Sequence, residues 1–200
     1  MADPLANPQF IVLSLPRSRS AWMAHFLRYG GTRVGHDLIP QCSSIAEFRA
    51  RLAPLAGTCE TGAVLGWKLI KSELPSAKLV VVKRDPLEVA GSLAKFGIEP
   101  DLDELVRRWV MLDIVSDLPG TLTIPYHALR TPEACKALFE FCLDFPFDWD
   151  WWSNLHTLRI EIDMAKRLEL LAQNSPALEA FKAEVAARSA GLSKGLSCLN

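Results

Sequence analysis

Two short apolar runs, each leading directly into a polar turn and a helix, constrain the fold of this chain most strongly. The first is FIVLSLPRSRSAWMAHFL at residues 10–27, and the second is AKLVVVKR at residues 77–84. Continuous apolar runs of this kind are typical of strands that are covered on both faces, as in parallel sheets. The sequence therefore predicts buried strands at 9–14 and 77–84, each followed by a helix.

The rest of the chain continues this alternation of strands and helices. Further strands are predicted at 63–70 and 121–126. Helices are predicted at 20–29, 45–55, from 85 onward, at 102–115, at 132–143 and over about 153–188. Strands that alternate with helices indicate an α/β layered domain with a mainly parallel sheet.

The helix after the second run carries three agreeing start signals. Asp85 is a good N-cap residue, Pro86 stands at the first helical position, and Glu88 occupies the capping-box position. We therefore expect the chain to turn from strand to helix at Asp85.

Length, net charge and cysteine content exclude several classes of function for this chain. The chain has 200 residues, which suits one domain, and its formal net charge of −1 argues against a general nucleic-acid or membrane-surface binder. No apolar run approaches the ~20 residues of a membrane span, and no secretory signal is seen. The five cysteines are scattered and form no metal-binding pattern, so reduced thiols in a cytoplasmic protein are expected.

The turn after the first predicted strand has the composition of an anion site. Arg17 and Arg19 supply positive charge, and Ser18 and Ser20 supply hydroxyl donors. A helix that begins near Ser20 adds unpaired backbone N–H groups and the positive end of its dipole. The Walker A pattern is absent. Taken alone, an ordinary polar loop explains this turn equally well.

The end of the second predicted strand offers another anion point. Arg84 ends the strand, and Ser92 lies two helical turns further on, on the same helix face as Asp85 and Glu88. One arginine and one serine would suit a phosphate. The alternative is a capped helix in which Arg84 pairs with a surface carboxylate.

Four segments resemble those of sulfotransferases and occur in the family's order across residues 9–148. LPRSRSAW resembles the 5′-phosphosulfate-binding loop, and KLVVVKRDPLEVAGSL resembles the 3′-phosphate-binding segment with arginine and serine at the family spacing. GWKLIKSELPSAKLVVVKRDP and TIPYHALRTPEACKALFEFCLDFPFD are similar to two further segments of the bacterial branch. The resemblance implies a three-layer P-loop-like α/β domain over residues 1–200, with a helical C-terminal third.

The same resemblance implies a donor and the residues that bind it. The donor would be 3′-phosphoadenosine 5′-phosphosulfate (PAPS), and no metal is expected. The 5′-phosphosulfate would be bound by Arg17, Ser18, Arg19, Ser20 and Ala21. The 3′-phosphate would be bound by Arg84 and Ser92.

Four departures from the family pattern bear on this site. Arg19 stands where the family usually has glycine, and Ala21 stands where it usually has a second hydroxyl residue. The acidic YEDL pattern is replaced by YHAL at residues 126–129. The family's C-terminal donor loop has only a faint counterpart around Lys194.

Sulfuryl transfer needs a cation at the bridging oxygen and a group that takes the acceptor's proton. Arg17 is the predicted cation, with Lys68 or Lys71 as helpers. By its position in the resemblance, Asp37 is the predicted base, together with its neighbour His36. Glu73 is the competing candidate, since it stands where the cytosolic branch has its catalytic histidine.

The sequence therefore predicts a sulfotransferase that acts on a hydroxyl or amine of a small molecule or a glycan. Two alternatives stay open. One is a P-loop nucleotide or nucleoside kinase-like protein, against which the missing Walker lysine speaks. The other is a non-catalytic relative that binds an adenosine bisphosphate.

Overall fold

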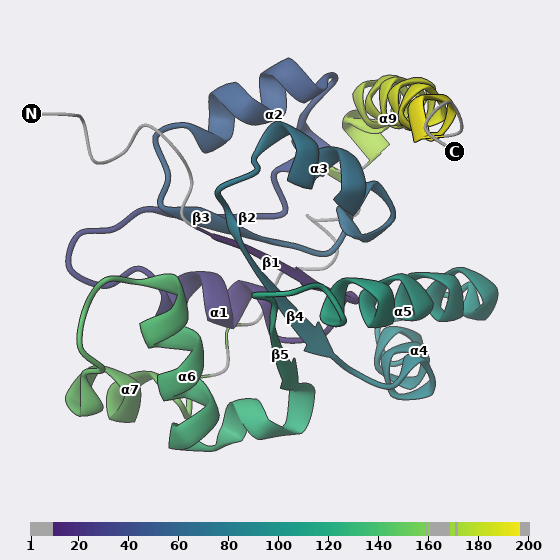
Figure 1. Cartoon of the computed structure of the whole chain (residues 1–200). Helices are drawn as coiled ribbons and strands as arrows, with labels where there is room; N and C mark the ends of the chain where they lie inside the picture. Colours follow the sequence, from purple (N-terminus) through teal and green to yellow (C-terminus); the bar gives the residue numbers. More distant parts are fainter. Residues whose placement is uncertain (1–9, 159, 161–168, 171, 197–200) are drawn as a thin grey trace, which may run out of the picture.

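The computed structural model describes residues 10–158, 160, 169–170 and 172–196, with side chains described up to Arg188. Among these residues, five parallel strands form one sheet in the order β2-β3-β1-β4-β5 (Figure 1). The strands are β1 Phe10–Ser14, β2 Val34–His36, β3 Gly57–Glu60, β4 Lys78–Lys83 and β5 Leu122–Pro125. The predicted parallel α/β fold is confirmed, as are the strands predicted at 9–14, 77–84 and 121–126.

Helices cover both faces of the sheet, which gives the three layers that the resemblance implied. Side chains of a strand alternate between the two faces of a sheet, so both faces of β1 are apolar and need cover. Phe10 and Val12 belong to one core cluster, and Ile11 and Leu13 belong to the other. The first cluster is covered by α1 Ser20–Phe26, α6 Pro132–Cys142 and α7 Trp149–Leu155. The second is covered by α2 Ile45–Leu52, α3 Trp67–Glu73, α4 Pro86–Ala94, α5 Leu102–Ser116 and α9 Ser175–Leu196 (Figure 1).

The strand predicted at 63–70 is wrong. This segment is a short 3-10 helix, η2 Val64–Gly66, that continues into α3. Val64, Trp67 and Ile70 are buried while Leu65 and Lys68 are exposed, which is helical spacing and not the alternation of a strand.

The strand that pairs with β1 instead is β3, which the sequence analysis missed together with β2. Its sequence is GTCE, so two of its four buried residues are polar and no apolar run marks it. Gly57 is required there, because a Cβ atom at this position would lie 2.5 Å from the carbonyl oxygen of Phe10. The residues of β3 are therefore explained by the close approach of the β1 backbone at Gly57 and by the polar network that contains Thr58 and Glu60.

The start of α4 follows the sequence prediction in part. The Asp85 carboxylate accepts hydrogen bonds from the backbone N–H groups of Leu87 and Glu88, so the predicted N-cap is confirmed. The Glu88 carboxylate lies 3.0 Å from His127 Nε2 and accepts a hydrogen bond from Arg84 Nε at 3.4 Å. The Glu88 side chain thus connects α4 to the 3-10 helix η3 Tyr126–Arg130. The sequence analysis had expected this side chain to complete a capping box at the start of α4.

The predicted helical stretch 153–188 is confirmed in part, because α7 ends at Leu155 and residues 156–158 and 160 are not helical. Helix α7 begins at Trp149, and α9 runs from Ser175 to Leu196. Residues 161–168 and 171, which fall within the predicted helical stretch 153–188, lie outside the described residues. The side chain of Lys194 also lies outside them.

Candidate active site

The two predicted anion points meet at the carboxyl edge of the sheet. Strands β1 and β4 are neighbours, and the strand order reverses beside β1, the point in such folds at which ligands collect. Arg17 Nε donates a hydrogen bond to Ser92 Oγ at 3.3 Å, and the Arg84 guanidinium donates one to the backbone carbonyl of Arg17. The structure thus brings Arg17, Arg84 and Ser92 together.

Aromatic rings orient both guanidinium groups. The Arg17 guanidinium carbon lies 4.2 Å from the ring centre of Phe96, and that of Arg84 lies 4.1 Å from the ring centre of Tyr126. Stacking of this kind limits the freedom of a long side chain and stabilises its charge. Among the described residues Arg17 donates one hydrogen bond, although a guanidinium has five N–H donors. The arrangement therefore has donor capacity for an anion.

The backbone of the site is strained. Among the described residues, non-glycine residues with positive φ are Arg17 at 62°, Arg19 at 63° and Asp37 at 47°. Residues with a side chain rarely adopt this left-handed conformation, which persists where the surrounding structure enforces it and is concentrated at functional sites. All three strained residues line the same cleft.

The serines of the turn differ in their contacts. Ser18 is fully buried, and its hydroxyl has no hydrogen-bond partner in the described structure. Buried polar groups normally have a partner. Ser18 is not among the described residues that line the cleft, so the structure does not bring its hydroxyl to that site. Ser20 Oγ lies 3.0 Å from His36 Nε2, which connects the turn to β2.

Arg19 makes its contacts on the α7 side of the turn. Its guanidinium donates hydrogen bonds to the backbone carbonyls of Leu129 at 3.1 Å and His156 at 3.3 Å, and its carbon lies 4.5 Å from the ring centre of Trp22. Burial lowers the pKa of Arg19 from its ordinary value. Arg19 thus fastens the turn to η3 and to the end of α7.

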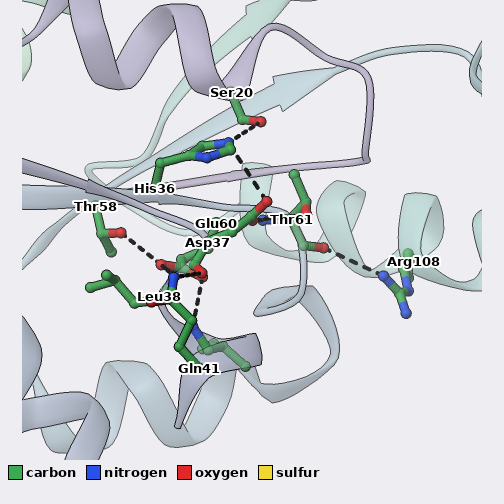
Figure 2. A network of polar contacts seen from close by, with 10 residues as sticks. Ser20, His36, Asp37, Leu38, Gln41, Thr58, Glu60, Thr61 and Arg108 are labelled. Carbon is green, nitrogen blue, oxygen red and sulfur yellow. Dashed lines mark hydrogen bonds and ion pairs between the residues drawn. The ribbon is translucent and has the colours of Figure 1, made fainter. Parts of the chain in front are cut away.

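His36 and Asp37 form a polar network with neighbouring residues at the end of β2 (Figure 2). Asp37 Oδ1 accepts hydrogen bonds from the backbone N–H and the hydroxyl of Thr61, both at 2.9 Å, and Asp37 Oδ2 lies 3.6 Å from His36 Nε2. Asp37 lines the cleft, whereas His36 is not among the described lining residues. Of the two predicted bases, Asp37 is therefore the one that faces a ligand.

Sequence reasoning missed Glu60, the central residue of this network. Its side chain is fully buried and accepts hydrogen bonds from the N–H groups of Leu38 at 2.9 Å and Ile39 at 3.4 Å and from the Thr58 hydroxyl at 2.6 Å (Figure 2). Burial, and then the negative charge of Asp37, raise the pKa of Glu60 to about 7, although its hydrogen bonds act in the opposite direction. Glu60 holds the backbone that follows strained Asp37.

The competing base Glu73 and the two predicted helper lysines lie on α3, and each has contacts with neighbouring residues. The Glu73 carboxylate pairs with Arg49 at 3.0 Å and with Arg188 at 3.1 Å. Lys71 Nζ donates to the carbonyls of Pro75 and Ala77, and the exposed Lys68 lies beside the Trp67 ring. Neither lysine is among the described residues that line the cleft, so the structure does not bring them to Arg17.

A cleft of about 1300 Å³ connects these groups. At one end it is lined by the predicted donor residues Arg17, Arg19, Ser20, Ala21, Arg84 and Ser92, with Asp37 beside them. From there it extends between α2, α3 and α9 along mainly apolar side chains. Within the described part of the chain, no cluster of three metal-ligand side chains is found, and no helix is long and apolar enough to cross a membrane.

Comparison with solved structures relates this architecture to a known fold. A sulfotransferase from Alicyclobacillus acidocaldarius superposes with a TM-score of 0.53 at 15% sequence identity, covering 88% of this chain and 95% of that chain. The chain has a sulfotransferase-like fold. No family model matches the sequence, and no curated protein matches it either. The likeness therefore rests on the arrangement of the strands and helices.

Proposed function

We propose that this protein transfers a sulfuryl group from PAPS to a hydroxyl or amine of an acceptor. The observation that carries the proposal is the meeting of Arg17, Arg84 and Ser92 at adjoining strand ends, in a fold that resembles a sulfotransferase. PAPS carries two separated anionic ends, and this edge of the sheet offers cations and hydroxyl donors for both. The strained turn supports the same reading.

In this proposal the donor residues take the roles that the resemblance implied. The turn from Arg17 to Ala21 holds the 5′-phosphosulfate through its backbone N–H groups and the Arg17 guanidinium. Arg84 and Ser92 hold the 3′-phosphate. Arg19 contributes its backbone to the turn, because its guanidinium is bonded to two carbonyls on the α7 side.

The chemistry needs charge stabilisation and removal of one proton. The acceptor oxygen or nitrogen forms a bond to sulfur while the bond from sulfur to the bridging phosphate oxygen breaks, and adenosine 3′,5′-bisphosphate leaves. Arg17 stabilises the charge that develops on the bridging oxygen. Asp37 accepts the acceptor's proton from its place in the cleft wall.

His36 and Glu60 act through Asp37 in this scheme. His36 Nε2 lies between Ser20 Oγ and Asp37 Oδ2, so it connects the donor turn to the proton acceptor. Glu60 fixes the backbone after Asp37. Glu73, the competing base, is paired with two arginines and is therefore less suited to take a proton.

The first experiment is a thermal-shift titration with adenosine 3′,5′-bisphosphate and, separately, with Mg-ATP. Saturable stabilisation by the bisphosphate alone is expected, and ligand at 100 times its dissociation constant should add about 2.7 kcal/mol. A response to Mg-ATP alone would replace the proposal with the kinase-like alternative. Bisphosphate binding without sulfuryl transfer from PAPS to any acceptor in a screen of alcohols, phenols, amines and glycans would support the non-catalytic relative.

A further inference from the structure

Exposed large apolar side chains gather around the cleft. Four of them line it and come from separate segments of the chain: Leu65, Phe96, Leu158 and Ile160. Single exposed apolar residues are common on protein surfaces, but several that surround one concave site indicate an apolar ligand. The mouth of the cleft is therefore apolar next to its cationic end.

The deeper part of the cleft continues this apolar surface between α2, α3 and α9. Its walls there include Phe48, Leu69, Ile70, Leu178 and Phe181. The rings of Phe48 and Phe181 meet edge to face with centres 6.4 Å apart, which joins α2 to α9. Pockets with apolar walls and a few directed polar groups are the usual sites of small organic ligands.

The charged side chains that line the cleft away from the donor turn are already in ion pairs, several of them with residues outside the lining. The pairs are Glu73 with Arg49 and Arg188, Glu104 with Arg108, and Lys182 with Glu179. Recruiting any of them to a charged ligand would break an existing ion pair. Beyond the donor turn, Arg84 and Asp37, the described lining thus favours an uncharged ligand.

The size of the cleft leaves room for a second molecule. Single-ligand pockets typically measure about 300–1,000 Å³. The cleft of about 1300 Å³ exceeds that range, and the donor-binding residues occupy one end of it. Asp37 and its hydrogen-bond partner Thr61 line this cleft together with the apolar Ile39, Ala63 and Leu65.

We propose that the acceptor is an uncharged alcohol or phenol with an apolar body. This inference rests on the proposed function and names the substrate class of the same site. The apolar body packs against Leu65 and the walls formed by α2, α3 and α9, while the hydroxyl lies beside Asp37. Amines that are protonated at neutral pH, sugars and carboxylated acceptors are excluded by the apolar walls and the paired charges.

The test is calorimetric titration of the full chain with three probes, without donor and with saturating adenosine 3′,5′-bisphosphate. The probes are 2-naphthol, its charged analogue 6-hydroxy-2-naphthoate, and glucose. We expect 2-naphthol to bind at least ten-fold more tightly than either of the others. Leu65→Gln should weaken naphthol binding about five-fold, which corresponds to losing part of the burial of one leucine. Leu102→Gln is the matched control, because Leu102 is 40% exposed and outside the cleft while Leu65 is 46% exposed and inside it.

The outcomes separate this inference from the proposed function. Naphthol binding that Leu65→Gln weakens and Leu102→Gln leaves unchanged supports the apolar site, whether or not the bisphosphate binds. Bisphosphate binding together with equal affinity for the three probes overturns the inference and leaves the proposed function standing. Equal effects of the two leucine variants overturn it as well.

Discussion

Replacing Glu60 with glutamine should remove a pH dependence of stability that this one buried carboxyl creates. The pKa of Glu60 is raised to about 7 from an ordinary value of 4.5. Between these two values the folded chain keeps a proton that the unfolded chain has lost. The free energy of unfolding therefore falls as the pH rises through this window and levels off above pH 7.

The size of the effect follows from the gap between the two pKa values. At about 1.36 kcal/mol for each pH unit, a gap of about 2.5 costs about 3 kcal/mol, most of it between pH 5 and pH 8. Typical domains have unfolding free energies of about 5–15 kcal/mol, so a loss of this size is readily measured. Glu47, whose pKa is lowered to about 2, is ionised throughout this range and does not contribute to the slope.

The measurement is urea unfolding of the wild type and of Glu60→Gln at several pH values between 5 and 8. The wild type should lose about 2 to 3 kcal/mol more than the variant across this range. Glu140→Gln, an exposed change on α6, is the control and should keep the wild-type slope. Parallel curves for the wild type and Glu60→Gln would refute the assignment of a protonated Glu60 at the site.

Three further predictions concern binding, turnover and packing. Arg17→Ala and Arg84→Ala should each weaken adenosine 3′,5′-bisphosphate binding at least ten-fold in calorimetry, because charge-assisted hydrogen bonds are worth about 1.5–3 kcal/mol, while Lys136→Ala should not. Asp37→Asn should retain bisphosphate binding but lose about 10²- to 10⁴-fold in turnover with PAPS and an alcohol acceptor, and undiminished turnover would exclude Asp37 as the base. Phe139→Ala should lower the free energy of unfolding by about 3–5 kcal/mol in urea, because this fully buried ring packs against Phe26; a loss under 1 kcal/mol would contradict the packing described.

The apolar runs made strands β1 and β4 predictable, because strands that are buried on both faces are usually apolar. Strands β1 and β4 satisfy this condition along their whole length or nearly so. Strand β3 does not, because its GTCE sequence serves a close approach to Phe10 and the polar network around Glu60. Local patterns could not reveal it, since both of these reasons come from residues that are distant in the sequence.

Sequence reasoning named candidate site residues where one turn carries the chemistry and missed them where several segments combine. Arg17 follows β1, Arg84 follows β4 and Ser92 lies on α4, and the neighbouring positions of β1 and β4 bring the three together. The role of Glu60 could be recognised only from the structure, in which β3 places its side chain beside the backbone that follows Asp37. In the sequence, Glu60 follows Thr58 and Cys59 and precedes Thr61 and Gly62. This pattern resembles an ordinary polar loop.

Arg19 shows how a departure from a family pattern can be accommodated physically. Glycine adopts a left-handed conformation at no steric cost, whereas Arg19 holds a φ of 63° with a full side chain. The energetic cost of this conformation is opposed by the hydrogen bonds from Arg19 to the carbonyls of Leu129 and His156 and by its stacking on Trp22. These contacts hold the Arg19 guanidinium on the side of α7 while its backbone keeps the left-handed conformation. The substitution therefore transfers the constraint on the turn from the backbone to three tertiary contacts, and the turn depends on the packing of η3 and α7.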